Sequence, residues 1–247
     1  IAMVLGPAVG LYALQAYGSS ILYLFLTIMT GVALVLSNTI RLPKELAKPK
    51  HKSMKGWHIS QFIEKRSLPW ALMGLFIGFT YSGVLVFIPI ELNSIGAGVW
   101  GSVFFALFAL MIIISRPLVG KIYARYGSRF VIYPGIILFI MGLAILGIAD
   151  TPVGIIGTAP LLGLGYGAVQ PAFQALAVQS APIERAGVST ATYFLALDIA
   201  VGAGSIILAM IANALGYQYL YQITALIMVV ALGLYHFIIK GYSNFEV

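Results

Sequence analysis

Long apolar runs separated by short polar connections constrain the fold of this chain more than any other feature of its sequence. Most of these runs approach about 20 residues, the length at which an α-helix crosses a hydrocarbon core of about 30 Å. Because no water is present there to satisfy backbone groups, uninterrupted apolar runs of this length predict helices. The chain is therefore expected to be an all-α polytopic membrane protein with eight transmembrane helices, at about 1–18, 20–40, 68–90, 97–118, 130–149, 152–179, 188–212 and 217–239.

The basic residues are distributed unevenly among the connections. All 14 Lys and Arg residues lie after the second, fourth, sixth and eighth runs or, for Arg116, at the end of the fourth, and the other turns contain none. Two of those other turns hold Glu91 and Asp150, which are expected to be solvated loop charges. Since cytoplasmic loops retain Lys and Arg, the alternation predicts that the basic loops and the C-terminus are cytoplasmic. It also predicts that no Lys or Arg reaches the middle of the membrane.

The composition supports a membrane protein and argues against several other classes. Hydrophobic residues make up 61% of the chain and charged residues 9%, whereas a soluble domain carries about 25% charged residues. The net charge of +7 follows from the positive-inside pattern, so no nucleic acid partner is expected. The chain has no cysteine, its histidines lack the spacing of metal ligands, and neither a metal nor another cofactor is expected. No convergent catalytic set or channel filter is visible in the sequence, so neither an enzyme nor a channel is expected.

The long connection at 41–67 divides the chain into two groups of helices. This connection is rich in Lys and is expected to be a basic cytoplasmic linker. It separates a pair of helices at 1–40 from a set of six at 68–240, and a cytoplasmic tail follows at 241–247. The part at about 56–66 is either a solvated linker or a short amphipathic helix on the membrane surface. Ile1 has no polar flank and no leader before it, so the chain is expected to begin inside a membrane helix.

Three segments resemble signatures of the major facilitator superfamily. Gly6, Pro7 and Gly10 resemble the core of a fifth-helix motif that is typical of antiporters. The segment at 182–187, which includes Glu184 and Arg185, is similar to the loop between helices 10 and 11. A third segment resembles the basic loop signature between helices 8 and 9, and its matching residues are Arg116, Gly120, Lys121, Arg125, Gly127 and Arg129. Here Ala124 replaces the acidic residue of that signature, so the charge interaction of that residue is absent or replaced.

The resemblance covers the whole chain and implies both an architecture and a function. It implies helices 5–12 of a twelve-helix fold, with helices 1–4 missing, in a monomer of a bacterial cell membrane. The likeness is greatest to bacterial drug and sugar efflux permeases, which implies proton-coupled export of a small molecule by alternating access. Proton-coupled uptake of a sugar or small metabolite is the alternative, and a polytopic membrane protein without transport activity is a more distant one. The expected partners are the lipid bilayer, a small-molecule substrate, protons and the missing helices.

Asp198 is the acidic residue that lies far from any predicted helix end. It lies about ten residues, and hence about 15 Å, from the start of its helix near Val188, which is the middle of the membrane. An ionised carboxylate without a partner is costly at that depth. We therefore expect Asp198 either to hold a proton or to meet a cation outside this chain. The functional interpretation is a proton-coupling group, and the alternative is a protonated side chain bonded to the backbone of a neighbouring helix.

Other polar residues near the middle of the predicted helices are candidates for the wall of a substrate cavity. Gln170 precedes Pro171, which frees a backbone carbonyl, and Tyr81 lies near the middle of its helix. The neighbouring Gly163 and Gly167 are expected to serve close helix packing, because glycines at this spacing bring helices together. At the basic ends of the helices, Glu184 and Arg185 are candidates for a gate with the 116–129 loop.

Overall fold

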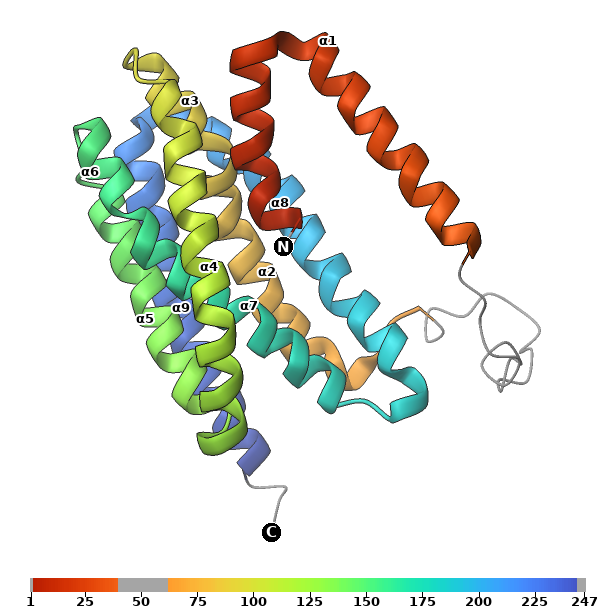
Figure 1. Ribbon diagram of the computed structural model, residues 1–247. Coiled ribbons are helices and arrows are strands. Elements are labelled where there is room, and N and C mark those ends of the chain that lie inside the picture. The colour runs from red at the N-terminus through yellow and green to blue at the C-terminus, as the bar shows by residue number, and fades with distance from the viewer. Residues whose placement is uncertain (1, 40–61, 244–247) are drawn as a thin grey trace.

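The computed structural model describes residues 2–39 and 62–243, and the regular elements in these ranges are helical. The elements are α1 (Ala2–Thr39), η2 (Lys65–Ser67), α2 (Leu68–Ser82), η3 (Gly83–Phe87), α3 (Ile88–Ser94), α4 (Val99–Tyr126), α5 (Arg129–Leu146), α6 (Pro152–Gly157), α7 (Ala159–Gln179), η4 (Ile183–Arg185), α8 (Ala186–Leu215) and α9 (Tyr217–Ser243). Figure 1 shows them as a bundle of roughly aligned helices with α1 at one side. The prediction of an all-α chain is confirmed.

Seven helices in the described residues are long and apolar enough to cross a membrane. They correspond to seven of the eight predicted spans. The remaining predicted span is the part of α1 before Gly18, where the backbone has a non-helical φ of 79°. Residues 2–17 form a helical arm of about 24 Å at 1.5 Å per residue, which is shorter than a hydrocarbon core. In Figure 1 this arm and the following part of α1 form a hairpin.

Local sequence signals account for the helix boundaries. Thr151 caps the N-terminus of α6, since its hydroxyl oxygen accepts a hydrogen bond from the Gly154 N–H at 3.1 Å, and Pro152 occupies the first turn. The α4–α5 turn passes through Gly127, whose φ of 88° is a conformation that residues with a side chain rarely adopt. Between α2 and α3 the helix widens into the π-helical segment η3 without breaking the span.

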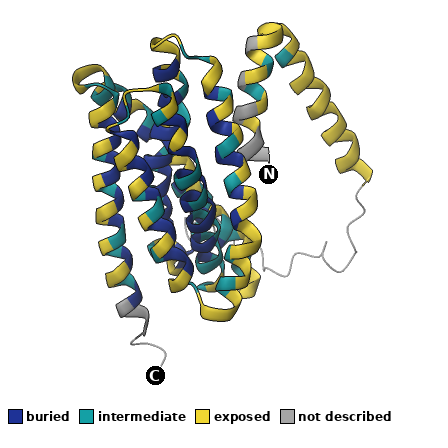
Figure 2. Ribbon diagram, turned by 60° about the vertical axis from the view of Figure 1, so that its left-hand side comes forward, coloured by how far each residue is buried: buried dark blue, intermediate teal, exposed yellow. Residues whose placement is uncertain are grey.

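The core of the bundle lies among α2, α4, α5, α7, α8 and α9, where α2 packs along α8 and α7 packs between α4 and α5. Gly163 confirms the predicted packing role of the α7 glycines, because a Cβ there would lie 2.6 Å from the Phe108 carbonyl oxygen of α4. Phe104, Phe105 and Phe108 of α4 are buried among these helices. Figure 2 shows buried residues on the inward faces of the bundle and mostly exposed residues on the second arm of α1.

Two predicted segments lie largely or partly outside the described residues. Most of the 41–67 linker falls there, including 56–61 of the 56–66 segment for which an amphipathic helix is one alternative. The described end of the linker, Lys65–Ser67, is a short 3-10 turn that leads into α2. In the predicted tail, α9 continues to Ser243, and 244–247 are outside the described residues.

Candidate functional site

Polar residues of three helices lie near the midpoints of their spans. Tyr81, Tyr166 and Asp198 lie within about 2 Å, along the helix axis, of the midpoints of the spans Lys65–Ser94, Pro152–Gln179 and Ile183–Leu215. Tyr166 of α7 lies within electrostatic range of Tyr81, Asp198 and also Arg116. The fold therefore brings Tyr81 and Asp198, two of the residues predicted to form the site, to one level of the bundle.

Asp198 occupies an exposed position on α8. The opposite face of this helix carries Tyr193, Leu197 and Ala200, which are buried in the bundle. Asp198 makes no ion pair with any residue of 2–39 or 62–243. In Figure 1, α8 borders the side of the bundle on which α1 lies. The carboxylate is thus directed away from the packed core.

Tyr81 belongs to an aromatic cluster in the bundle core. Its ring is 5% exposed and stacks on Tyr166 with the ring centroids 4.2 Å apart. A second stacking contact joins it to Phe108 of α4 at 6.1 Å. These contacts give the ring a packing role, and contact of Tyr81 with a substrate stays a prediction.

Gln170 lies directly before Pro171 in α7 and is half-buried. Its carbonyl oxygen accepts a hydrogen bond from the Tyr193 hydroxyl of α8 at 3.1 Å. This bond ties α7 to α8 one residue before Pro171, where the helix lacks a backbone donor. The structure therefore shows a role for the Gln170 backbone, and a role for its side chain in a cavity stays a prediction.

The extent of α4 differs from the prediction at Arg116. The apolar run was expected to end at 118, but α4 continues to Tyr126 with Pro117 inside it. Arg116 lies ten residues before Tyr126, which is about 15 Å along the helix. The physical reason is that one proline removes a single backbone hydrogen bond, and the following turns of α4 restore the helix. The distance from Arg116 to the end of α4 is thus about the same as the distance predicted between Asp198 and the start of its helix near Val188.

The other residues of the 116–129 signature mostly lie in helices rather than in a loop. Gly120, Lys121 and Arg125 belong to the last turns of α4, and Arg129 begins α5. Gly127 lies in the short turn between the two helices. The guanidinium of Arg125 lies over the Tyr126 ring, 5.3 Å from its centroid.

A hydrogen-bonded cluster joins the helix ends where these basic residues lie. Arg185 forms an ion pair with the buried Glu64, whose backbone N–H donates to the Thr192 hydroxyl oxygen at 2.9 Å. Ser67 of η2 and Ser189 of α8 both donate to the Ala177 carbonyl oxygen, at 2.9 and 2.6 Å. The start of α2, the end of α7 and the start of α8 are therefore held together.

This cluster gives Arg185 a partner that the sequence did not predict. Its ion pair is with Glu64 at the end of the linker, whereas a gate with the 116–129 segment was expected. Glu184 is exposed. The bond that joins the 116–129 segment to the end of α7 runs from the Tyr123 hydroxyl to Gln179 Oε1, at 3.1 Å.

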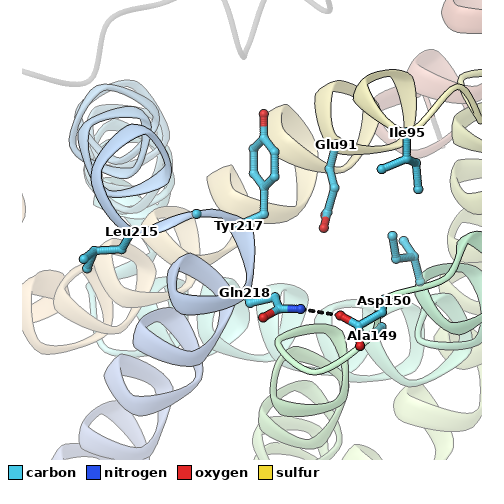
Figure 3. Close-up of a pocket in the computed structure, with 9 residues that line it drawn as sticks. Glu91, Ile95, Ala149, Asp150, Leu215, Tyr217 and Gln218 are labelled. Carbon is cyan, nitrogen blue, oxygen red and sulfur yellow. Dashed lines mark hydrogen bonds between the residues drawn. The ribbon is translucent and has the colours of Figure 1, made fainter.

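The opposite end of the bundle contains a pocket of about 290 Å³, which Figure 3 shows. Glu91 lines this pocket but is 8% exposed, and it accepts a hydrogen bond from the Tyr221 hydroxyl at 2.9 Å. Asp150 accepts a hydrogen bond from Gln218 of α9. The prediction that Glu91 is a solvated loop charge is wrong, because α3 continues through this position and α9 covers it. Glu91 directly follows the apolar residues Ile88, Pro89 and Ile90, and this apolar context is the sequence signal for the burial of Glu91.

Gly6, Pro7 and Gly10 lie in the first arm of α1, which packs against α4. A Cβ at Gly6 or Gly10 would meet no atom within 4 Å, so neither glycine serves close packing in the described residues. The predicted antiporter role of this motif stays a prediction.

A bundle of long apolar helices, with Asp198 near the middle of one of them, is typical of a polytopic membrane protein. Comparison with protein families specifies the class further. The model of the Major Facilitator Superfamily matches residues 1–205, which is most of the chain. The chain belongs to the major facilitator superfamily.

Proposed function

We propose that this protein is a proton-coupled secondary transporter that exports a small molecule, with Asp198 as the proton-coupling residue. The single observation that carries the proposal is the exposed Asp198 carboxylate near the midpoint of α8. A charge at this depth is costly unless it is paired or neutralised, so ionisable residues in membrane helices are functional by default.

A change of partner on protonation would link the Asp198 carboxylate to the transport cycle. An ionised Asp198 is stabilised by a nearby cation, and a protonated one needs none. Alternation between these two forms would couple proton binding to the rocking motion by which transporters of this kind expose a midplane site to each side.

The distribution of basic residues supports an orientation for the transport cycle. Arg125, Arg129 and Arg185 lie at the same end of the bundle, and the pocket with Glu91 and Asp150 lies at the other. Under the positive-inside rule the basic end and the C-terminus face the cytoplasm of a cell membrane. Export as the direction rests on the likeness of the Gly6, Pro7 and Gly10 segment to an antiporter motif.

Transport by the intact protein in proteoliposomes tests the role of Asp198. A pH gradient would be imposed, and the flux of ethidium and of radiolabelled glucose would be followed as probes for export and for sugar uptake. The wild type should move one probe saturably and in step with the gradient, and Asp198→Asn should reduce this flux to that of empty vesicles. Exchange of the same probe without a gradient should persist in Asp198→Asn, since it requires no net proton movement.

Asp150→Asn is the matched control, because it makes the same chemical change at the far end of the bundle. It should keep the gradient-driven flux of the wild type. The proposal is wrong if Asp198→Asn transports the probe with undiminished dependence on the pH gradient. Flux against the direction of proton movement would indicate export, and flux in the same direction would indicate the uptake alternative.

A further inference from the structure

The contact between α4 and α7 changes character along its length. In the middle of the helices the two backbones nearly touch, because glycines of α7 face α4. A Cβ at Gly163 would lie 2.6 Å from the Phe108 carbonyl oxygen, and one at Gly167 would lie 3.0 Å from Ile112 Cα. No side chain can enter the interface at these positions.

Beyond Pro171 the same interface opens into a crevice of about 270 Å³. Small residues line it on the α7 side, and Gly120 lines it on the α4 side, where an added Cβ would meet no atom within 4 Å. The hydroxyl of Tyr123 donates to Gln179, so the Tyr123 side chain is held at the crevice. The lining residues are Arg116, Val119, Gly120, Tyr123, Pro171, Ala172 and Ala175.

Arg116 is the charged residue of this lining, which contains no acidic side chain. It forms no ion pair with a residue of 2–39 or 62–243. Arg116 is exposed and lies inside α4, ten residues before its end at Tyr126. A guanidinium in such a place provides planar donors that match the two oxygens of a carboxylate.

We propose that the crevice between α4 and α7 is a binding subsite for the carboxylate of a transported organic anion, with Arg116 as the recognition residue. This proposal rests on the proposed function and adds the chemical class of the substrate to it. The apolar part of the crevice would receive the hydrocarbon portion next to the carboxylate.

Ligand-induced thermal stabilisation of the purified intact protein tests the subsite without any transport measurement. The probe is benzoate, compared with benzamide as its neutral analogue, at constant ionic strength set with sodium chloride. The wild type should show a saturable rise in Tm with benzoate and none with benzamide. Arg116→Gln should weaken the apparent affinity for benzoate at least about tenfold, since a hydrogen bond to a charged group contributes that much or more.

Two further variants separate charge from shape and from general effects of net charge. Gly120→Leu fills the open space beside Arg116 while keeping the charge, and it should also abolish the benzoate response. Lys65→Gln removes one positive charge at an exposed position outside the crevice, and it should respond as the wild type does. Arg116→Lys should restore part of the affinity lost in Arg116→Gln, because a point charge replaces the planar donor group.

The subsite is absent if the wild type gives no saturable response that is specific to benzoate, or if Arg116→Gln responds as the wild type does. Because the assay has no gradient and no flux, its result is independent of the Asp198→Asn transport experiment. A benzoate site with unchanged transport in Asp198→Asn would refute proton coupling alone. Loss of coupled flux in Asp198→Asn without a benzoate response would refute the subsite alone.

Discussion

The close approach of α2 and α8 makes Gly78 a sensitive position. A Cβ at Gly78 would lie 2.5 Å from the Leu197 carbonyl oxygen and 3.1 Å from Ala200 Cβ. Ordinary carbon–oxygen contacts are about 3.3 Å or longer, so Gly78→Ala would force the two helices apart by about 0.8 Å at this point. Overpacking of this kind lowers the free energy of unfolding by about 1–3 kcal/mol. Replacing a glycine within a helix by alanine raises it by about 0.5–1 kcal/mol. The free energy of unfolding should therefore fall by up to about 2.5 kcal/mol.

Unfolding of the purified protein in dodecyl maltoside by added SDS, followed by circular dichroism, measures this change. Gly233→Ala in α9 is the matched control, because Gly233 is exposed and a Cβ there would meet no atom within 4 Å. The control keeps the helix-propensity gain and lacks the clash, so its stability should stay the same or rise slightly. Equal stability of Gly78→Ala and Gly233→Ala would refute the close approach of α2 and α8.

The remaining stability predictions concern one buried hydrogen bond and one turn. Tyr221→Phe removes the donor to the buried Glu91, and the free energy of unfolding should fall by about 1–3 kcal/mol, whereas Tyr219→Phe at an exposed position should leave it unchanged. An unaltered SDS unfolding curve for Tyr221→Phe would exclude a stabilising bond. Gly127→Ala should cost about 1–3 kcal/mol, because φ is 88° there, while Gly187→Ala lacks this constraint and is the control. Equal Tm values for these two variants would contradict the strained turn.

The spans could be predicted from the sequence because hydropathy is a local property. Each run of about 20 apolar residues must form a helix in the membrane wherever its neighbours lie. The predicted spans accordingly correspond to the observed helices, except that the part of α1 before Gly18 is a shorter arm and α4 continues past 118 to Tyr126. The family was recognised for the same reason, since its signatures are short stretches of contiguous sequence.

The depth of Arg116 could not be read from the same pattern. A charge next to a proline looks like the end of an apolar run, and the prediction placed both residues at the surface. The helix instead continues through Lys121 and Arg125 to Tyr126, so Arg116 lies inside α4 and not at its end. Hydropathy marks where a segment stops being apolar, and it does not mark where the helix stops.

The burial of Glu91 shows a second limit of sequence reasoning. Its carboxylate is covered because Tyr221, 130 positions later in the chain, donates a hydrogen bond to it. The ion pair of Glu64 with Arg185 likewise joins segments that are far apart in sequence. No local pattern contains such pairs.

By itself, the sequence determined that this chain is a helical membrane transporter, where its spans lie, and that Asp198 is near the middle of one of them. These properties depend on apolar length and on residue position within a run. Only the tertiary structure decided that Arg116 lies inside α4, beside a crevice, and that Tyr81 is packed against Tyr166. The physical reason is that depth, burial and charge pairing depend on how far helices extend and which faces they turn toward each other.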